Sequence, residues 1–291
     1  MIPGEFDYHS ASSVDEAVAL LERLGDDAKL LAGGHSLVPA MRFRLALPQH
    51  LVDISAIDGL RYIREEGGAL AIGAMTRESD IDRSALVAQR YPLLADAARV
   101  IADPLVRNRA TVGGNLAHAD PANDHPAVML AYGATLVGQG ANGRREIAAD
   151  DFFTGLFENA LAANEILVEI RIPAPGSGAG GAYEKFERKV GDYAVSAAAV
   201  QLVMDGGTCS AARIALTNVS AVPMRATGAE SAAVGQQVTD EVIEAAGQAA
   251  AAECDPSADL RGSVEYKRDL TRVMVKRAIR RAVQRAQGGG A

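Results

Sequence analysis

The sequence predicts an α+β protein in three parts, and three observations support this fold class. Near the N-terminus a helix, a strand and a glycine loop follow one another before the next strand. The middle of the chain alternates short strands with glycines and helices. Beyond a linker rich in proline and glycine, an antiparallel meander of three strands precedes two helices. The predicted parts are residues 1–55, 56–175 and 180–287.

The first part has clear boundary signals. Ser13 and Glu16 have the spacing of a capping box, in which Glu16 reaches back to the cap. Apolar residues then recur at helical spacing from Val14 to Leu24, and Gly25 ends the helix. Residues 28–32 predict a buried strand that runs into the glycine loop, and residues 51–54 predict the next strand.

The other two parts are separated by residues 173–181, which hold two prolines and four glycines in nine positions. Before this linker the pattern predicts strands at 60–65, 69–72, 135–139 and 166–172, and helices at 91–101 and 124–133. After it we expect strands at 182–189, 194–204 and 211–219, followed by helices at 239–254 and 266–287.

Composition excludes several functions. The chain has 291 residues, a formal net charge of −8, 4% aromatic residues and no tryptophan, which disfavours nucleic-acid binding. No apolar run approaches the length of a membrane span, and the N-terminus lacks a basic-then-apolar signal. We therefore expect a cytoplasmic protein, which partners can bring to the inner face of the membrane.

Metal ligands are scarce in this chain. Cys209 and Cys254 are its only cysteines, whereas a [2Fe–2S] cluster usually takes four. The five histidines show no metal-binding spacing such as H-E-x-x-H. We predict no metal here, so any iron–sulfur or molybdenum centre must belong to other subunits.

Two double-glycine loops are the most informative feature. The first is Ala32-Gly33-Gly34-His35-Ser36, and the second is Thr111-Val112-Gly113-Gly114-Asn115. Glycine allows close approach of a ligand, and successive exposed N–H groups make anion-binding nests. Neither loop matches the G-x-G-x-x-G fingerprint or is followed by a Walker A lysine. One such loop alone is a plain tight turn as readily as a binding site, whereas the pair indicates an extended diphosphate held from two sides.

These loops resemble those of the FAD-binding medium subunits of molybdenum-containing hydroxylases. The likeness runs from the N-terminus to the last helix and is greatest to the aerobic carbon monoxide dehydrogenases. Further matching segments are residues 1–8, 51–54, 72–76, 101–104, 120–124, 183–186, 189–194 and 216–219. The resemblance implies a two-part FAD-binding domain of the vanillyl-alcohol oxidase or PCMH type, followed by a C-terminal three-stranded antiparallel sheet with helices.

The resemblance also implies a set of FAD-binding residues. The backbone of the first loop would take the pyrophosphate, with the Ser36 hydroxyl as a further donor, and the second loop would close the opposite side. The set comprises Ala32, Gly33, Gly34, His35, Ser36 and Leu37 at the first loop, and Thr111, Gly113, Gly114 and Asn115 at the second, together with Asp124, Leu167, Lys185 and Tyr193.

The last four residues carry individual expectations. By resemblance, Asp124 contacts the adenosine end, or else it caps a helix before Pro126. Lys185 and Tyr193 are expected near the flavin ring as the catalytic residues: Lys185 stabilises charge on the reduced flavin, and Tyr193 covers or gates one face. The alternatives are a surface lysine and a packed aromatic ring. Leu167 lines the ring or belongs to the core.

The resemblance implies an electron-transfer function. Iron–sulfur clusters in a small subunit would reduce FAD, and FAD would pass electrons to a quinone, a cytochrome or oxygen. A large subunit would carry the molybdenum cofactor, in a dimer of heterotrimers. Carbon monoxide is the first substrate expectation, with heterocycles, purines or aldehydes as alternatives. A self-contained flavin oxidase, with His35 available for a covalent link, and a scaffold with a vestigial site also stay open.

The last predicted helix is strongly basic. Eight of its residues are lysine or arginine, against only Glu265 and Asp269. An apolar stripe that includes Val275, Ile279 and Val283 accompanies them. The sequence leaves two interpretations, a solvated helix packed on its own domain or a docking element for an acidic partner.

Overall fold

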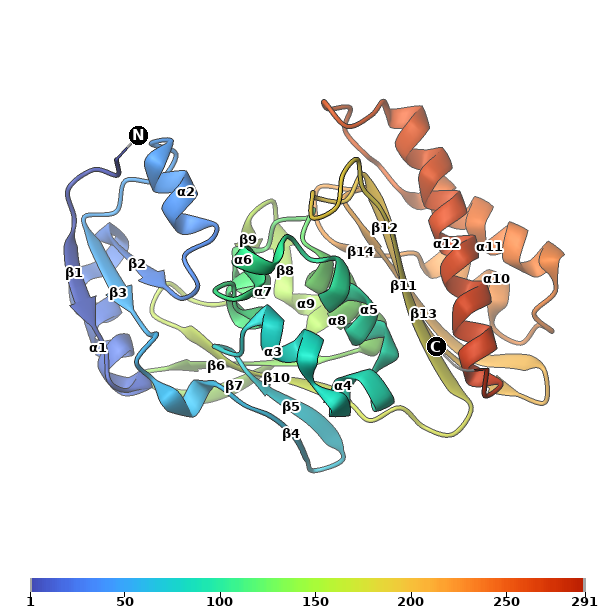
Figure 1. The fold of residues 1–291 in the computed structure, drawn as a ribbon, viewed down its shortest axis with the longest axis horizontal. Helices are drawn as coiled ribbons and strands as arrows, with labels where there is room; N and C mark the ends of the chain where they lie inside the picture. Colours follow the sequence, from blue (N-terminus) through green and yellow to red (C-terminus); the bar gives the residue numbers. More distant parts are fainter. Residues whose placement is uncertain (1, 290–291) are drawn as a thin grey trace.

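A computed structural model describes residues 2–289, and its layers follow one another along the longest axis of the molecule (Figure 1). A small parallel sheet with its helices comes first, then a five-stranded antiparallel sheet. A group of short helices separates this sheet from a four-stranded antiparallel sheet, and three helices cover the outer side. The α+β class with a two-part first region and a C-terminal sheet is confirmed.

The first layer is the predicted helix, strand and glycine-loop unit. Its order is β1 (Asp7–Ser10), α1 (Val14–Leu24), η1 (Gly25–Asp27), β2 (Ala28–Leu31), α2 (Leu37–Arg42) and β3 (His50–Asp53). The strands are parallel with β3 in the centre. Ser13 caps α1 as predicted, but Glu16 accepts from the Ser12 N–H rather than from the cap residue.

The second layer joins strands that lie far apart in the sequence. Its spatial order is β4 (Ile63–Glu66), β5 (Ala69–Gly73), β10 (Ile166–Pro173), β6 (Thr135–Gly140) and β7 (Gly143–Ala148). A β-bulge between Leu167 and Glu169 shifts the register of β10, so the inward face changes along the strand. Ile166 and Val168 pack toward the first layer, whereas Leu167 and Ile170 pack toward the helices.

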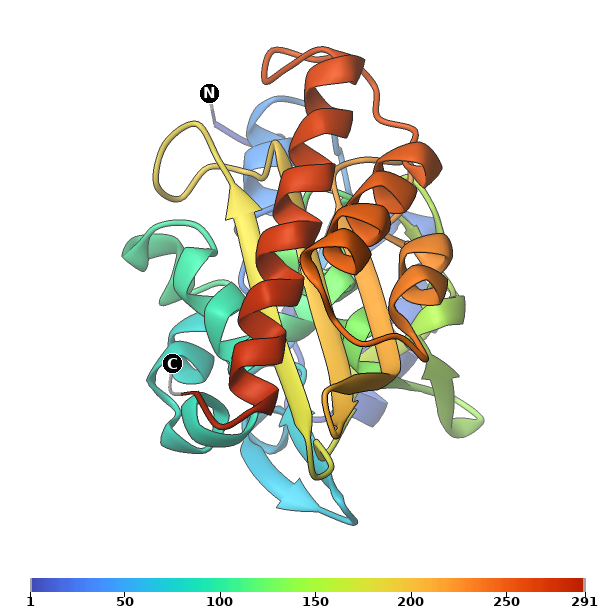
Figure 2. The same ribbon diagram turned by 90° about the vertical axis from the view of Figure 1, so that its right-hand side faces the viewer.

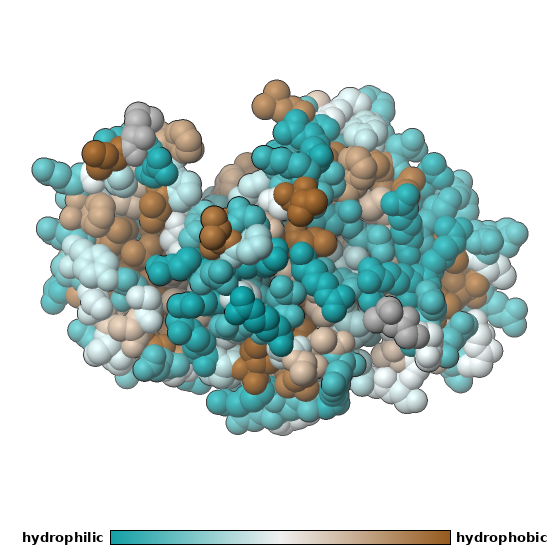
Figure 3. Space-filling view, viewed as in Figure 1, coloured by the Kyte–Doolittle hydropathy of each residue, from teal (hydrophilic) through white to brown (hydrophobic). Residues whose placement is uncertain are grey.

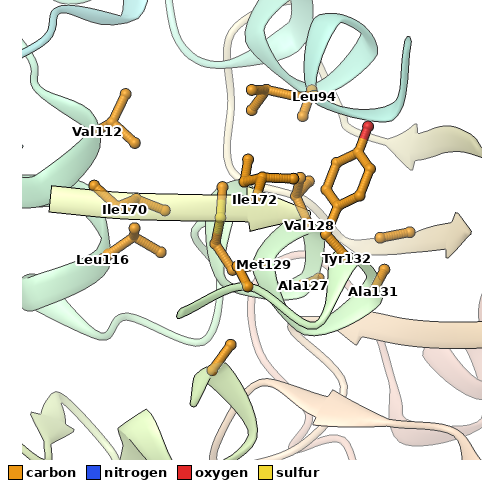
Figure 4. Packing of buried hydrophobic residues seen from close by; sticks show 14 of the residues in the cluster. Leu94, Val112, Leu116, Ala127, Val128, Met129, Ala131, Tyr132, Ile170 and Ile172 are labelled. Atoms are coloured by element: carbon orange, nitrogen blue, oxygen red, sulfur yellow. The ribbon is translucent and has the colours of Figure 1, made fainter. Parts of the chain in front are cut away.

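Short helices fill the space between the two large sheets. They are α3 (Glu78–Arg83), α4 (Ala85–Arg90), α5 (Pro92–Val100), α6 (Pro104–Arg107), α7 (Val112–His118), α8 (Asp124–Tyr132) and α9 (Ala149–Phe152). The hairpin of β8 (Phe153–Gly155) and β9 (Glu158–Asn159) completes this region, whereas η2 (Asp58–Leu60) packs with the first layer through Leu60. Val112 and Leu116 of α7 face Ile170 in the central core (Figure 4). The helix that carries the second glycine loop is therefore fixed by burial.

The C-terminal sheet contains β11 (Ala179–Phe186), β12 (Ser196–Asp205), β13 (Thr208–Thr217) and the short β14 (Met224–Arg225). The three long strands are the predicted meander, and β14 adds two residues at one edge. β10 extends through Pro173 and β11 begins at Ala179, so the linker is shorter than predicted. One face contacts α5 and α8, and α10 (Thr227–Ala233), α11 (Asp240–Glu253) and α12 (Val264–Ala286) lie on the other side (Figure 2).

The basic side chains of α12 are largely paired within the chain. Arg281 and Arg285 converge on the buried carboxylate of Asp96, with Arg285 Nη1 at the shorter distance of 2.6 Å. Arg272 and Lys276 both bind Glu244. Further pairs join Lys267 to Asp259 and Arg280 to Asp240. These contacts favour the interpretation that α12 packs on its own chain.

Candidate functional site

The two glycine loops meet in space. A Cβ on Gly33 would lie 2.5 Å from the carbonyl oxygen of Arg109, immediately before the second loop. A Cβ on Gly113 would lie 2.5 Å from the Cβ of Ala74, and the Gly113 N–H donates to the Ala74 carbonyl at 2.9 Å. Side chains are excluded at both contacts, so the loops and the end of β5 pack backbone to backbone.

The first loop presents unused donors. The backbone N–H groups of Gly33, Gly34, His35 and Ser36 have no hydrogen-bond acceptor within residues 2–289. His35 is exposed, and its Nδ1–H donates to the Gly33 carbonyl at 2.9 Å. Consecutive free N–H groups of this kind bind anionic oxygens without a cationic side chain. Leu37 then begins α2.

The second loop is built differently, although the sequence treats the two alike. Its Gly113 N–H is already bonded to Ala74, the Gly114 N–H donates to the Thr111 hydroxyl at 3.2 Å, and the Asn115 N–H donates to the Thr111 carbonyl at 2.9 Å. Its free polar group is the side-chain oxygen of Asn115, which is buried without a partner among the described residues. A buried acceptor of this kind costs free energy unless a donor reaches it, so Asn115 fits a bound ligand.

A cavity of about 210 Å³ connects residues of both loops. Pockets for drug-sized ligands start near about 300 Å³, so this cavity holds only part of a dinucleotide. Four predicted residues line it, namely Ala32, Gly113, Gly114 and Leu167. The remaining lining residues are Leu30, Ile54, Ala74, Met75, Ala117, Asn159, Leu161, Ala162 and Glu165. The sequence did not predict the lining residues at 159–165, because they belong to or follow a β hairpin that lies far from both loops in the sequence.

Asp124 and Lys185 form a second group behind the loops. The Nζ of Lys185 lies 3.0 Å from Oδ2 of Asp124 and donates to the Val100 carbonyl at 3.0 Å. The Tyr183 hydroxyl donates to Oδ1 of Asp124 at 2.6 Å. Two alternatives from the sequence are wrong: Asn123, not Asp124, occupies the helix cap, and Lys185 is buried rather than on the surface.

Burial controls the titration of this group. It raises the pKa of the Asp124 carboxyl, while the positive charge of Lys185 opposes that rise. It also raises the pKa of the Tyr183 hydroxyl well above its ordinary range, and the Asp124 carboxylate adds to this. Partial burial raises the pKa of Tyr193, whose side chain is 44% exposed. Tyr193 is therefore only partly packed.

A buried ion pair next to this group was not found from the sequence. Nε2 of His125 lies 2.6 Å from Oε2 of Glu78, and both side chains are fully buried. Glu78 begins α3 and His125 follows Asp124 in α8, so the pair ties α3 to α8. Glu78 and His125 lie far apart in the sequence, so a single sequence carries no signal that pairs them.

Within residues 2–289, no group of three or more histidine, cysteine, aspartate or glutamate side chains is arranged to hold a metal ion. None of the helices in this range is long and apolar enough to cross a membrane.

The fold and the paired glycine loops define a flavin-binding subunit of a dehydrogenase. Residues 4–175 match the family described as FAD binding domain in molybdopterin dehydrogenase, and residues 181–282 match the CO dehydrogenase flavoprotein C-terminal domain. The chain belongs to the family of FAD-binding medium subunits of molybdopterin dehydrogenases, and it is an FAD-dependent oxidoreductase subunit.

Similar proteins cover the chain almost completely. The carbon monoxide dehydrogenase medium chain of Hydrogenophaga pseudoflava is 53% identical over 97% of this chain and 98% of its own length. That of Afipia carboxidovorans is 46% identical over 99% and 100%. A solved structure of the carbon monoxide dehydrogenase from Hydrogenophaga pseudoflava, lacking the Mo-pyranopterin moiety, matches with a TM-score of 0.96 at 54% identity over 98% of this chain and 99% of the solved chain.

Proposed function

We propose that this chain is the electron outlet of a molybdenum-containing carbon monoxide dehydrogenase. It would hold FAD between its glycine loops, receive electrons from iron–sulfur clusters of a partner subunit and pass them to an external acceptor. FAD suits this task because, when bound, it converts between one-electron and two-electron steps. The two medium chains at 53% and 46% identity support carbon monoxide over heterocycles, purines or aldehydes as the substrate of the complex.

The proposal rests on one observation: the first loop leaves backbone N–H donors free, whereas the second leaves a side-chain acceptor free. Four free N–H groups of the first loop supply donors for the pyrophosphate, and Ser36 adds a hydroxyl. The unpartnered Asn115 oxygen of the second loop accepts from a ribose hydroxyl or the adenine amino group. Ala32 begins the first loop and Leu37 follows it, while the Thr111 hydroxyl accepts the Gly114 N–H and so holds the second loop in shape.

The remaining predicted residues have roles toward the flavin ring. Leu167 supplies an apolar wall of the cavity. Lys185 carries a positive charge that favours electron density on the reduced ring, and Asp124 fixes the position of its ammonium group. The adenosine contact expected of Asp124 stays a prediction, and its two oxygens also bind Tyr183 and Lys185. Tyr193, which is 44% exposed, covers or gates one face of the ring.

The proposal extends to the assembly. The partners are an iron–sulfur small subunit and a molybdenum large subunit in a dimer of heterotrimers, located in the cytoplasm or at the inner face of the membrane. The external acceptor is a quinone, a cytochrome or oxygen. We also propose the division into parts at 1–55, 56–175 and 180–287. The first family match ends at residue 175 and the second begins at residue 181, which supports the last boundary.

A pair of matched glycine variants tests the cofactor site. Gly34 and Gly25 both have positive φ, at 77° and 63°, but only Gly34 lies in the first loop. Gly34→Val puts a branched side chain into the first loop, where its Cβ would lie 3.3 Å from Val38 Cγ2 and 3.5 Å from Leu31 Cδ1, so the loop that would hold the phosphates must shift. Gly25→Val imposes backbone strain at the end of α1, where a Cβ meets nothing within 4 Å. We expect flavin content well below stoichiometric in the first variant and normal content in the second, with both chains folded by circular dichroism. Full flavin occupancy in Gly34→Val would refute the loop assignment, and flavin that acid does not release would instead support a covalent oxidase.

A further inference from the structure

Tyr193 lies under a guanidinium group from a distant part of the chain. The Cζ of Arg261 is 5.6 Å from the centroid of the Tyr193 ring, within the range of a cation–π contact. Arg261 belongs to the segment between α11 and α12. The residue expected at the flavin is therefore in contact with the segment that leads into α12.

The same arginine also binds the residue before the tyrosine. Nη2 of Arg261 donates to Oδ1 of Asp192 at 2.9 Å, and that oxygen accepts the Tyr193 backbone N–H at 2.9 Å. The Asp192 side chain is 10% exposed and that of Arg261 is 27% exposed, so the bridge is partly shielded from water. One planar cation thus holds both the ring and the backbone next to it.

Both ends of this bridge are anchored. The Arg261 N–H donates to Oδ1 of Asp259 at 2.7 Å, and Oδ2 of Asp259 binds the buried Lys267 of α12 at 2.9 Å. On the other side, a Cβ at Gly191 would lie 3.0 Å from the Ala102 carbonyl oxygen, so the Tyr193 loop packs directly on the backbone before α6. The loop has little freedom while the bridge is intact.

We infer that Arg261 is a positioning residue that holds Tyr193 over one face of the flavin ring. The inference rests on the role of Tyr193 in the proposed function. A guanidinium can stack on the ring and bridge the carboxylate at once, whereas a lysine ammonium cannot do both. Loss of Arg261 frees the ring without opening the core. Figure 3 shows a hollow on the upper side of the molecule between the lobe that carries α2 and the rest of the chain, with apolar residues on the rim opposite this lobe. Val190 and Leu260, which flank the bridge in sequence, are 95% and 94% exposed.

The test uses a tryptophan reporter. The chain has no tryptophan, so Tyr193→Trp in the full chain introduces one fluorophore that retains the aromatic face. Arg261→Gln, Arg261→Lys and Asp192→Asn are added to this reporter chain singly, and Arg261→Gln is combined with Asp192→Asn. Arg268→Gln is the matched control, because Arg268 contacts only the exposed Asp255 at 3.9 Å among the described ion pairs. Circular dichroism verifies the fold of each variant.

Quenching by acrylamide, a neutral probe, measures the freedom of the reporter ring. We expect the quenching constant of the introduced tryptophan to rise about two- to fivefold in Arg261→Gln and Asp192→Asn, the range that an exposed cation–π contact supports. The double variant should show no more than the larger single effect, Arg261→Lys should be intermediate, and Arg268→Gln should match the reporter chain. A quenching constant in Arg261→Gln or Asp192→Asn equal to that of the reporter chain would overturn the inference. If Arg261→Gln fails to fold, Arg261→Lys and Asp192→Asn decide the question.

A second measurement separates the inference from the function on which it rests. Addition of FAD should quench the tryptophan emission by contact in the reporter chain, and less so once Arg261 is replaced. Bound FAD with no effect on the emission of the reporter chain would refute the location of Tyr193 at the flavin, whatever the acrylamide result. Equal quenching by FAD with and without Arg261→Gln would refute the positioning role of Arg261 alone.

Discussion

Lys185 Nζ lies 3.0 Å from Asp124 Oδ2, and the two side chains are 2% and 7% exposed. This ion pair joins β11 of the C-terminal sheet to the first turn of α8. Because the Val100 carbonyl and the Tyr183 hydroxyl complete the hydrogen bonds of the pair, neither charge is left without a partner. The pair therefore ties the C-terminal sheet to the helices of the central region through a buried polar group.

Removing one member of that pair should be costly. Lys185→Met leaves the Asp124 carboxylate buried and unpaired, and we expect a loss of about 3–5 kcal/mol in the free energy of unfolding. Adding Asp124→Asn removes the orphaned charge and should restore much of that loss. Chemical denaturation of the two variants measures both effects. Arg64→Ala, which breaks an exposed pair with Glu66, is the control. A Lys185→Met chain within about 1 kcal/mol of the parent would contradict the importance of this pair.

The His125–Glu78 pair should make stability depend on pH. Burial lowers the pKa of His125, but the Glu78 carboxylate outweighs it, so the net pKa lies above the ordinary value of 6.5. A raised pKa means that the stabilisation is complete below about pH 6.5 and is lost as the pH rises through the folded-state value. We expect the stability gap between the parent and His125→Gln to shrink with increasing pH in thermal denaturation. A gap that widens as the pH rises would show that His125 is buried neutral.

Asp96 should be a strong anchor for α12. Its carboxylate accepts from Arg281, Arg285 and the Tyr183 N–H, and its side chain is 4% exposed. Asp96→Ala should cost about 3–5 kcal/mol because it leaves the buried Arg285 without its carboxylate. Asp240→Ala removes the exposed partner of Arg280 and should change stability by less than about 0.5 kcal/mol. Equal effects of the two substitutions on the unfolding midpoint would argue against this anchor.

The contact between the loops can be opened at one position. Gly33→Ala puts a methyl group into the Arg109 carbonyl, which belongs to the rigid backbone, so the two loops must move apart. We expect the dissociation constant for FAD to rise at least about tenfold, equivalent to about 1.4 kcal/mol. Gly59→Ala meets nothing within 4 Å and serves as the control. Titration of the apo chain with FAD provides the measurement, and unchanged affinity in Gly33→Ala would show that the contact is not needed for binding.

Much of the fold was accessible from the sequence because strong local signals coincide there. The capping residue Ser13, the meander of β11 to β13 and the long α12 all have clear periodicity or boundary residues. α7 was not predicted, since two glycines disfavour a helix. Its stability comes from burial of Val112 and Leu116 and from the Thr111 cap, which are tertiary effects.

The site was predictable only in part for a similar reason. The glycine loops are visible as motifs, and the resemblance added Asp124, Lys185 and Tyr193. Three features of the site depend on contacts between distant segments. Asp124 binds Lys185, and Arg261 covers Tyr193. Val168 is bulged, so Leu167 faces the cavity. Such contacts leave no pattern in one sequence.

The central claim is that this chain carries the flavin but depends on partners to reduce it. The most direct measurement is the visible flavin absorbance of the full chain under anaerobic carbon monoxide, first alone and then mixed with the iron–sulfur and molybdenum subunits. The account predicts stoichiometric, acid-releasable FAD whose absorbance is unchanged by carbon monoxide alone and bleaches when the partners are added. Bleaching by carbon monoxide in the isolated chain, with metals shown to be absent, or no bound flavin at all, would contradict it.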